Sequence, residues 1–218
     1  MANHHDAFFK LIFSKKENVA DFSSQILPAT ISRQIDFSTL QQENTSYVDK
    51  ALSEHFSDTV YSCYMDKTRI KITLLFEHKS SPDKDLPFQL NKYMVRIWSA
   101  ESKQEQPFTP IVPIVFYHGN KNWKPGRLNS CFKNLPEILI SYIPDFNYRF
   151  VDLSDYSDED IKKRLFQLVS LKIGMLIFKH IYEPDTLEIQ LRNFFEIGKL
   201  YFQEQSGLDF LESIVTWD

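Results

Sequence analysis

The sequence has few cysteines and glycines, and it contains no long apolar run. Its two cysteines, Cys63 and Cys131, stand apart among 218 residues without a Cys/His cluster, which excludes a disulfide scaffold and a zinc centre of the usual type. Five glycines and no Gly-rich phosphate motif exclude P-loop and dinucleotide-binding enzymes. The N-terminus has no apolar signal segment, and the most apolar stretch, residues 165–181, is interrupted by two lysines and a glutamine. These absences predict a cytoplasmic protein with reduced thiols and no membrane partner.

Charge gives a second constraint, because the formal net charge is −4. Proteins that bind DNA strongly without sequence preference are usually basic, so this value does not favour such a role for the whole surface. The charges are unevenly distributed, however. Acidic side chains cluster within residues 152–160. Basic side chains that could form a local positive face occur within residues 84–127, namely Lys84, Lys92, Arg96, Lys121, Lys124 and Arg127.

A pair of oppositely charged residues lies at the end of an apolar segment in the middle of the chain. Residues 70–77 are rich in β-branched and apolar side chains and predict a strand. Glu77 and Lys79 are two positions apart at its end, so both side chains point to the same face. Metal-assisted phosphodiester hydrolysis uses such a pair: the carboxylate holds Mg²⁺, and the lysine steadies a water nucleophile or the charge that develops on phosphate.

A second carboxylate is predicted opposite Glu77. Residues 56–65 also read as a strand, and a polar turn, residues 66–69, separates the two strands. Antiparallel pairing centred between Lys67 and Thr68 places Asp58 directly opposite Glu77, with Cβ atoms roughly 4.5–5.5 Å apart. Two carboxylates at that distance can share a divalent cation. The alternative is an ordinary cross-strand pair at a sheet edge, with Lys79 neutralising both acids.

A helix is predicted to follow the pair. Pro and Asp residues mark residues 80–85 as a loop, and helical spacing of apolar side chains then predicts a helix over Leu86–Lys103. Gln89, Tyr93 and Arg96 form one polar stripe along it. We expect Gln89 to reach the same end of the sheet as Lys79, and Arg96 and Lys92 to offer contacts to DNA phosphates. A solvated surface stripe is the alternative interpretation.

Taken together, these segments resemble the bacterial recombination-promoting nuclease/putative transposase family (YhgA-like), within the PD-(D/E)xK nuclease superfamily. The similar pieces occur in order from His4 to about Trp123. They are His5-Asp6-Ala7-Phe8-Phe9-Lys10, Ile35-Asp36-Phe37-Ser38-Thr39-Leu40, Asp58-Thr59-Val60-Tyr61, Leu75-Phe76-Glu77-His78-Lys79-Ser80-Ser81-Pro82, Gln89-x-x-x-Tyr93-Met94-Val95-Arg96-Ile97-Trp98, Pro113-Ile114-Val115-Phe116-Tyr117-His118-Gly119 and Trp123. Ser57 stands where the superfamily name has proline, and Lys79 where many family members have glutamine.

The resemblance implies a fold and an activity. The fold is α/β (α+β), with a restriction-endonuclease-like αβββαβ core in which a mixed sheet is flanked by helices. The activity is Mg²⁺-dependent DNA endonuclease cleavage, with Mn²⁺ as a substitute. Asp58 and Glu77 would ligate the metal, and Lys79 would assist the attacking water. Gln89 completes the candidate catalytic set, with Asp6 and Tyr93 as accessory residues. A catalytically weak DNA-associated or protein-interaction module that retains the fold is the alternative.

The remaining segments complete the expected architecture. We expect a nuclease core over residues 1–125 and a mainly helical extension over residues 126–218 that packs on the core or mediates homodimer formation. The first helix is expected over Asp6–Leu27, and a short strand over Ser46–Lys50. Further expected elements are a strand over Ile111–Tyr117 and helices over Glu137–Ile143, Asp158–Ile181 (capped at Ser157 and Asp158) and Pro184 to about Gln205.

Overall fold

A computed structural model of the chain describes residues 2–43, 59–65 and 70–215. The chain forms two compact units, one made of Met1–Gln34 with Asp152–Asp218 and the other of Ile35–Val151. These boundaries differ from the expected division at residue 125. A compact structural unit need not have the same bounds as a functional domain, so the expected division at residue 125 stays a prediction.

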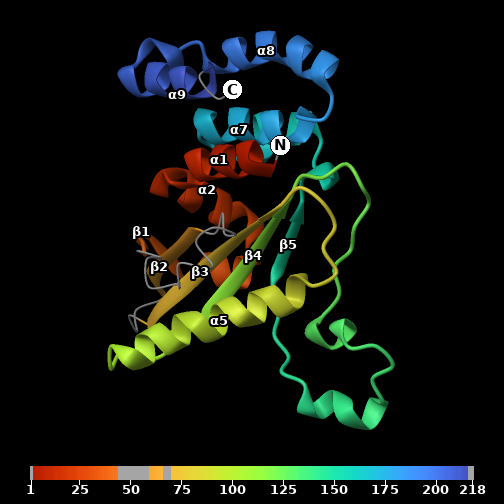
Figure 1. The fold of residues 1–218 in the computed structure, drawn as a ribbon. Helices are drawn as coiled ribbons and strands as arrows, with labels where there is room; N and C mark the ends of the chain where they lie inside the picture. The colour runs from red at the N-terminus through yellow and green to blue at the C-terminus, as the bar shows by residue number, and fades with distance from the viewer. Residues whose placement is uncertain (1, 44–58, 66–69, 216–218) are drawn as a thin grey trace. The chain divides into compact units, whose positions relative to one another are not determined.

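The unit formed by Ile35–Val151 is built on a mixed five-stranded sheet with the strand order β1-β2-β3-β4-β5 (Figure 1). β1 pairs antiparallel with β2, β2 pairs antiparallel with β3, and β3 pairs parallel with β4. The parallel pair requires a crossover connection, and helix α5 supplies it. The elements are β1 (Ile35–Gln42), β2 (Thr59–Met65), β3 (Ile70–Lys79), α5 (Leu86–Lys103), β4 (Ile111–Tyr117), the 3₁₀ helices η2 (Leu128–Cys131) and η3 (Glu137–Tyr142), and β5 (Arg149–Asp152).

Helix α5 covers one face of this sheet through an apolar cluster. Leu90 and Met94 face the sheet as their helical spacing predicted, and both are buried against Leu75 of β3 and Val115 of β4. Side chains on the opposite face of β3, such as Leu74 and Phe76, are also buried. Burial on both faces explains why β3 reads as a nearly continuous apolar run.

The second unit is helical (Figure 1). Phe8 of its first helix packs on Phe178 of the helix that follows residue 168, with ring centroids 4.8 Å apart. Its elements are α1 (Ala2–Phe13), α2 (Lys16–Ile26), α3 (Ala29–Ser32), η4 (Leu153–Asp155), α6 (Asp158–Asp160), the π-helical turn η5 (Ile161–Leu165), α7 (Val169–His180), α8 (Pro184–Gly198), η6 (Tyr201–Gln203) and α9 (Gln205–Val215). None of the helices within the described ranges is long and apolar enough to span a bilayer.

The fold class is confirmed, and α5, β4 and the short helix at Glu137 lie where the sequence placed them. The single helix predicted over Asp6–Leu27 is wrong, because it divides into α1 and α2. At this break the buried Asn18 side chain donates a 2.8 Å hydrogen bond to the Ile12 carbonyl at the end of α1. A strand missing from the prediction, β1, opens the sheet, whereas the expected strand over Ser46–Lys50 lies outside the described residues.

Two other long helices predicted from the sequence also differ in the structure. The segment predicted as one helix over Asp158–Ile181 divides before α7, where the Asp21 carboxylate accepts 2.8 Å hydrogen bonds from the backbone N–H groups of Gln167 and Leu168. This contact from a distant helix satisfies the backbone N–H groups of the N-cap residue of α7 and of the residue before it. The predicted cap at Ser157 is confirmed, since it forms a capping box with Asp160. The helix predicted from Pro184 to about Gln205 ends earlier, at Gly198, and is followed by η6. Helix α9 begins at Gln205, where the predicted helix ended, and was not predicted.

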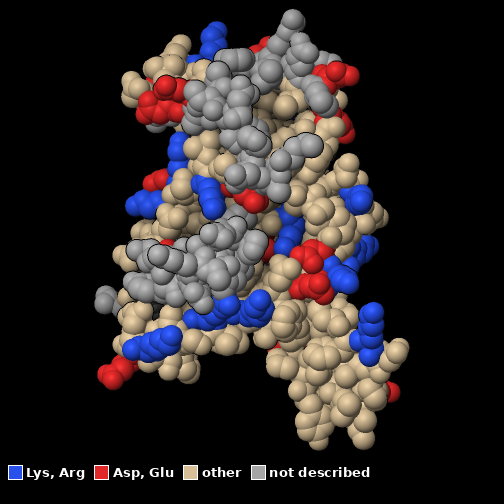
Figure 2. Space-filling view, viewed as in Figure 1, with Lys and Arg blue, Asp and Glu red and all other residues tan. Residues whose placement is uncertain are grey.

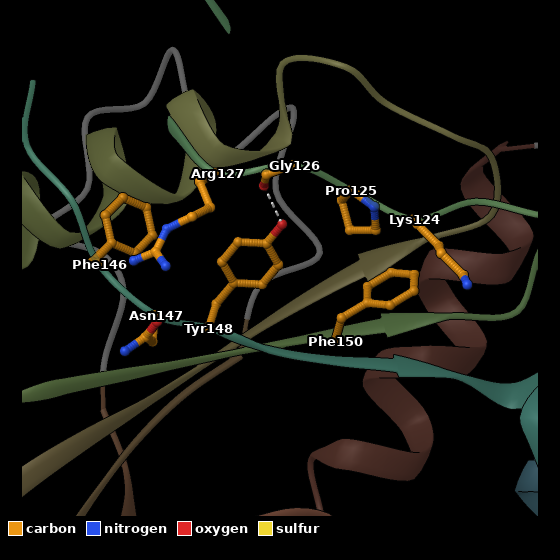
Figure 3. A pocket seen from close by; sticks show the side chains of 8 residues that line it. All are labelled: Lys124, Pro125, Gly126, Arg127, Phe146, Asn147, Tyr148 and Phe150. Atoms are coloured by element: carbon orange, nitrogen blue, oxygen red, sulfur yellow. Dashed lines mark hydrogen bonds between the residues drawn. The ribbon is translucent and has the colours of Figure 1, made fainter. Parts of the chain in front are cut away.

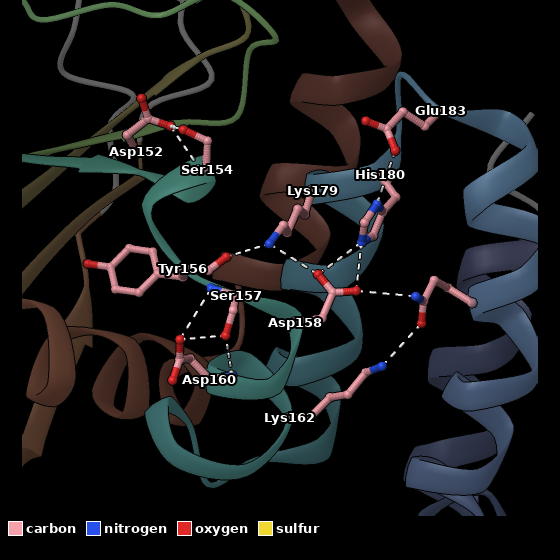
Figure 4. A network of polar contacts seen from close by, with 11 residues as sticks. Asp152, Ser154, Tyr156, Ser157, Asp158, Asp160, Lys162, Lys179, His180 and Glu183 are labelled. Atoms are coloured by element: carbon pink, nitrogen blue, oxygen red, sulfur yellow. Dashed lines mark hydrogen bonds and ion pairs between the residues drawn. The ribbon is translucent and has the colours of Figure 1, made fainter.

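Asp158 joins three helices of the helical unit (Figure 4). Its carboxylate lies 3.1 Å from Lys179 Nζ and 2.9 Å from His180 Nε2 on α7, and it accepts a 3.2 Å hydrogen bond from Gln190 Nε2 on α8. Burial alone would raise the pKa of Asp158, but the hydrogen bonds and positive charge of Lys179 and His180 outweigh burial and lower the pKa below its ordinary value. The carboxylate therefore stays ionised and holds α6, α7 and α8 together.

We predict that Asp158→Asn lowers the free energy of unfolding by about 1–3 kcal/mol at pH 7, since it weakens hydrogen bonds between charged groups. A carboxyl whose pKa is lowered by folding stabilises the protein above its unfolded-state pKa, and this contribution is lost as the pH falls through the folded-state pKa. The difference between parent and variant should therefore shrink below about pH 4. Urea unfolding at several pH values measures it. Glu159→Gln, which affects an exposed ion pair with Lys163, is the control and should change stability little. An equal loss in both variants would contradict the assignment.

Candidate active site at the end of strand β3

The site lies at the C-terminal end of strand β3, directly before the loop that leads to α5. Glu77 and Lys79 point to the α5 face of β3, as strand alternation predicted, and Lys79 Nζ lies 2.9 Å from Glu77 Oε1. Glu77 is only 4% exposed, and the Lys79 side chain 16%. A buried ion pair is costly to desolvate, so its presence at a strand end indicates a function other than stability.

Two further side chains complete the surroundings of the Lys79 ammonium. It donates a 2.9 Å hydrogen bond to Asp83 Oδ2 and a 2.8 Å hydrogen bond to Gln89 Oε1. With Glu77 these make three acceptors, which matches the three N–H donors of a lysine side chain. The prediction that Gln89 reaches Lys79 from the first turns of α5 is therefore confirmed as geometry.

Asp83 was not among the residues predicted for the site. Its Oδ2 also accepts a 2.7 Å hydrogen bond from Gln89 Nε2, and its Oδ1 accepts a 2.9 Å bond from the backbone N–H of Asp85. One carboxylate thus orients Lys79, Gln89 and the entry to α5. The sequence did carry a signal for the turn, because an aspartate in a polar loop commonly accepts a hydrogen bond from the backbone N–H two residues further on. Its closeness to Lys79, however, depends on how the loop folds back.

These contacts determine the charge of Lys79. Burial by itself lowers the pKa of this amine, but the charge of Glu77 and hydrogen bonds to Glu77 and Asp83 outweigh burial and raise the pKa above its usual value. For Asp83, burial raises the pKa, while the Lys79 hydrogen bond and the N–H of Asp85 outweigh burial and lower the pKa. Lys79 is therefore a fixed ammonium near neutral pH. It can donate hydrogen bonds and stabilise negative charge, but it cannot accept a proton from water.

The second oxygen of Glu77 indicates where a cation would bind. Glu77 Oε2 is buried and has no hydrogen-bond partner among residues 2–43, 59–65 and 70–215. A buried carboxylate oxygen without a partner is unfavourable unless a donor or a cation approaches it. Hard divalent cations prefer carboxylate oxygens, so Glu77 fits Mg²⁺ or Mn²⁺. The described part of the chain contains no group of three or more His, Cys, Asp or Glu residues placed to hold a metal.

The predicted second ligand, Asp58, lies outside the described residues. The register from which it was placed is confirmed where the strands are described, because Thr59 pairs with Phe76 and Val60 with Leu75. That pairing excludes the one-residue slip that would exchange the faces of β2. The approach of Asp58 to Glu77 stays a prediction.

The other residues predicted for the site differ in their surroundings. Tyr93 is 7% exposed and belongs to the apolar cluster between α5 and the sheet. Arg96 is partly buried on α5, and Lys92 is exposed, with Nζ 5.9 Å from the ring centroid of Phe88. Asp6 lies on α1, which belongs to the other compact unit. A functional role for each of these four residues stays a prediction.

Comparisons with known proteins agree with the resemblance seen in the motifs. Residues 3–206 match the family described as "Putative transposase, YhgA-like". Recombination-promoting nuclease RpnC of Escherichia coli K12 is 28% identical over 187 residues, which cover 84% of this chain and 60% of the relative. Recombination-promoting nuclease RpnA of the same organism is 29% identical over 189 residues, covering 84% and 62%.

A third relative carries a different description. The "Inactive recombination-promoting nuclease-like protein RpnE" of Escherichia coli K12 is 28% identical over 184 residues, covering 84% of this chain and 60% of the relative. The chain thus spans about three fifths of the length of these curated relatives. No solved structure matches it significantly.

We predict that Asp83→Ala releases the Lys79 ammonium, because the variant loses an acceptor of Lys79 and the group that orients Gln89. In ¹⁵N-labelled protein at low pH and temperature, the Lys79 ammonium protons should exchange slowly with water in the parent and rapidly in the variant. Asp85→Ala is the matched control, since Asp85 lies in the same loop, is exposed and makes no side-chain cap to α5. Unchanged Lys79 exchange in Asp83→Ala would show that Glu77 and Gln89 suffice to hold the ammonium.

Proposed function

Because the chain belongs to the family of YhgA-like putative transposases, we propose that it is a metal-dependent DNA endonuclease that hydrolyses phosphodiester bonds and takes part in recombination or DNA mobility. The observation that carries this proposal is the buried Glu77 carboxylate, with one oxygen on Lys79 and the other without a partner in the described chain. The names of RpnC and RpnA, recombination-promoting nucleases, support the same reaction class.

Glu77 and Asp58 would hold Mg²⁺, with Mn²⁺ as a substitute. When bound, such an ion offsets negative charge on the phosphate and makes a water molecule a better nucleophile. Glu77 supplies its free oxygen from a rigid position, because β3 is paired on both sides and its other oxygen contacts Lys79. A rigid ligand needs little rearrangement when substrate binds, which favours catalysis by preorganisation.

Lys79 would act through charge. The raised pKa keeps it an ammonium, so its charge would stabilise negative charge on the phosphate without removing a proton from water. A hydrogen bond from Lys79 to a phosphate oxygen or to the attacking water would replace one of its three present acceptors. Gln89 and Asp83 position it, since both accept hydrogen bonds from Nζ. Lys92 and Arg96, on the same helix as Gln89, are proposed to contact DNA phosphates and so to hold the substrate rather than to react.

A catalytically weak DNA-associated or protein-interaction module is the second candidate. It is favoured by the relative described as inactive and by the net charge of −4. The two candidates differ at Glu77. A module without catalysis needs no buried carboxylate at this strand end, whereas the proposed hydrolysis uses Glu77 as a metal ligand and Lys79 as a positive charge beside it. Assembly as a homodimer is a separate prediction, and neither candidate depends on it.

We predict that the protein nicks supercoiled plasmid DNA with Mg²⁺ or Mn²⁺ and not with EDTA, and that Glu77→Ala abolishes nicking while the far-UV circular dichroism is kept. Replacing Lys79 by methionine should slow cleavage on the order of 10²–10³-fold, the usual effect of losing one contact to developing charge. DNA binding, measured in EDTA, should survive both changes. Glu105→Ala, on an exposed turn, is the control and should cleave like the parent.

Titration calorimetry with Mn²⁺ separates ligand loss from misfolding. The parent and Glu105→Ala should bind Mn²⁺, and Glu77→Ala should not. If Glu77→Ala nicks DNA as fast as the parent, the cleavage belongs to another site or to a contaminant, and the endonuclease proposal fails. A parent that binds DNA and Mn²⁺ but does not cleave would favour the non-catalytic module.

A further inference from the structure

A hollow of ≈ 310 Å³ opens beside strand β5, in the same compact unit as Glu77 and Lys79 (Figure 3). We call it the aromatic pocket. Its lining includes Lys124, Arg127, Phe146, Asn147, Tyr148 and Phe150. This volume is at the lower end of the range for small-molecule sites in proteins, and it suits a single planar ring system such as a nucleobase.

The aromatic side chains form a regular row. Two of them, Phe146 and Tyr148, precede β5, and Phe150 lies in it, so that the three rings follow at intervals of two residues. All three pack against the apolar cluster between α5 and the sheet. The rings of Phe146 and Tyr148 have centroids 6.4 Å apart. The Tyr148 hydroxyl donates a 2.6 Å hydrogen bond to the Gly126 carbonyl, which fixes the orientation of its ring. A fixed row of rings is the kind of surface on which bases stack.

The aromatic pocket is connected to the candidate active site through one strand. Lys79 of β3 pairs with Tyr117 of β4, and the Tyr117 ring stacks on Phe150 with centroids 5.9 Å apart. Glu77, Lys79 and Phe150 therefore lie on the α5 face of the sheet. Two strand spacings separate Lys79 from Phe150, about 10 Å. That is a distance of one or two nucleotides along an extended strand.

The charges around the aromatic pocket favour a neutral ring over a small anion. Arg127 is paired with Asp145 by two hydrogen bonds of 2.9 and 2.5 Å, so its guanidinium is already neutralised. Lys124 is exposed and has no ion pair within the described residues. One cation at the rim of an apolar hollow suits the phosphate of a nucleotide whose base lies inside.

We propose that the aromatic pocket binds an unpaired base of the DNA strand, one or two nucleotides from the phosphate that is cut. This proposal rests on the proposed endonuclease function. A base within intact duplex is stacked on both neighbours and cannot enter the pocket, so the preferred substrate is DNA with a single-stranded segment, a gap or a frayed end. Stacking on Phe146 and Tyr148 holds the base, and Lys124 contacts its phosphate.

The first experiment measures binding in EDTA, so that no cleavage is needed. Fluorescence anisotropy compares a single-stranded oligonucleotide with a blunt duplex of the same sequence. The parent should bind the single strand more tightly, and Phe146→Leu or Tyr148→Leu should weaken that binding on the order of tenfold, the scale of one lost base–aromatic stack. Tyr148→Phe keeps the ring and loses only the hydrogen bond to the Gly126 carbonyl, so it should bind the single strand more tightly than Tyr148→Leu. Tyr142→Leu, which removes an 80% exposed tyrosine outside the aromatic pocket, is the matched control.

A second measurement uses only the parent protein and does not depend on how well the variants fold. Single strands carrying one 2-aminopurine at successive positions should show fluorescence quenching by protein at one or two adjacent positions, because an aromatic stack quenches this base. Quenching that is uniform along the strand, or equal binding by Phe146→Leu, Tyr148→Leu and Tyr142→Leu, overturns the proposal. Position-specific quenching by a protein that does not nick DNA would support base binding in the aromatic pocket and contradict the endonuclease proposal.

Discussion

The ion pair between Glu77 and Lys79 is the interaction on which the arrangement of the site depends. Two charges at the end of a buried strand are expensive to desolvate unless each finds further partners. Lys79 finds them in Asp83 and Gln89. One carboxylate oxygen of Glu77 contacts Lys79, and the other has no hydrogen-bond partner among the described residues. The surplus of charge at this strand end is therefore negative, which is the condition that a divalent cation requires.

The crossover through α5 brings these partners together. A parallel pair of strands needs a long connection, and the connection from β3 to β4 returns over one face of the sheet as α5. Its apolar side anchors the helix on Leu75 and Val115. Its first turns then hold Gln89 above Lys79, and Asp83 fixes the loop between them. The same packing that stabilises the sheet thus positions the polar groups.

The sequence predicted those parts whose structure follows from local periodicity. β4 and α5 have the predicted bounds, and the β2–β3 register follows from the length of the turn. The breaks between α1 and α2 and before α7 were missed, because they depend on Asn18 and Asp21 contacting backbone that is distant or lies across a turn. No glycine or proline marks them. For the site, alternation predicted Glu77 beside Lys79, and helical spacing predicted Gln89.

Asp83 was missed for the same reason as the helix breaks, since its contacts depend on a loop that folds back on the strand it follows. The row of rings at Phe146, Tyr148 and Phe150 has an alternating pattern but carries no charge, so a search for charged or metal-binding residues passes over it. The absence of charge in this row of rings matters because the chain as a whole has a net negative charge. Phosphate contacts depend on positive charge and weaken with salt, whereas stacking of a base on an aromatic ring needs no net charge. Under the proposed function, a protein with a net charge of −4 would hold a DNA strand through a few cations on α5 and near residue 124, together with neutral stacking. Such binding would depend less on salt than that of a basic nuclease, and it would favour strands whose bases are unpaired.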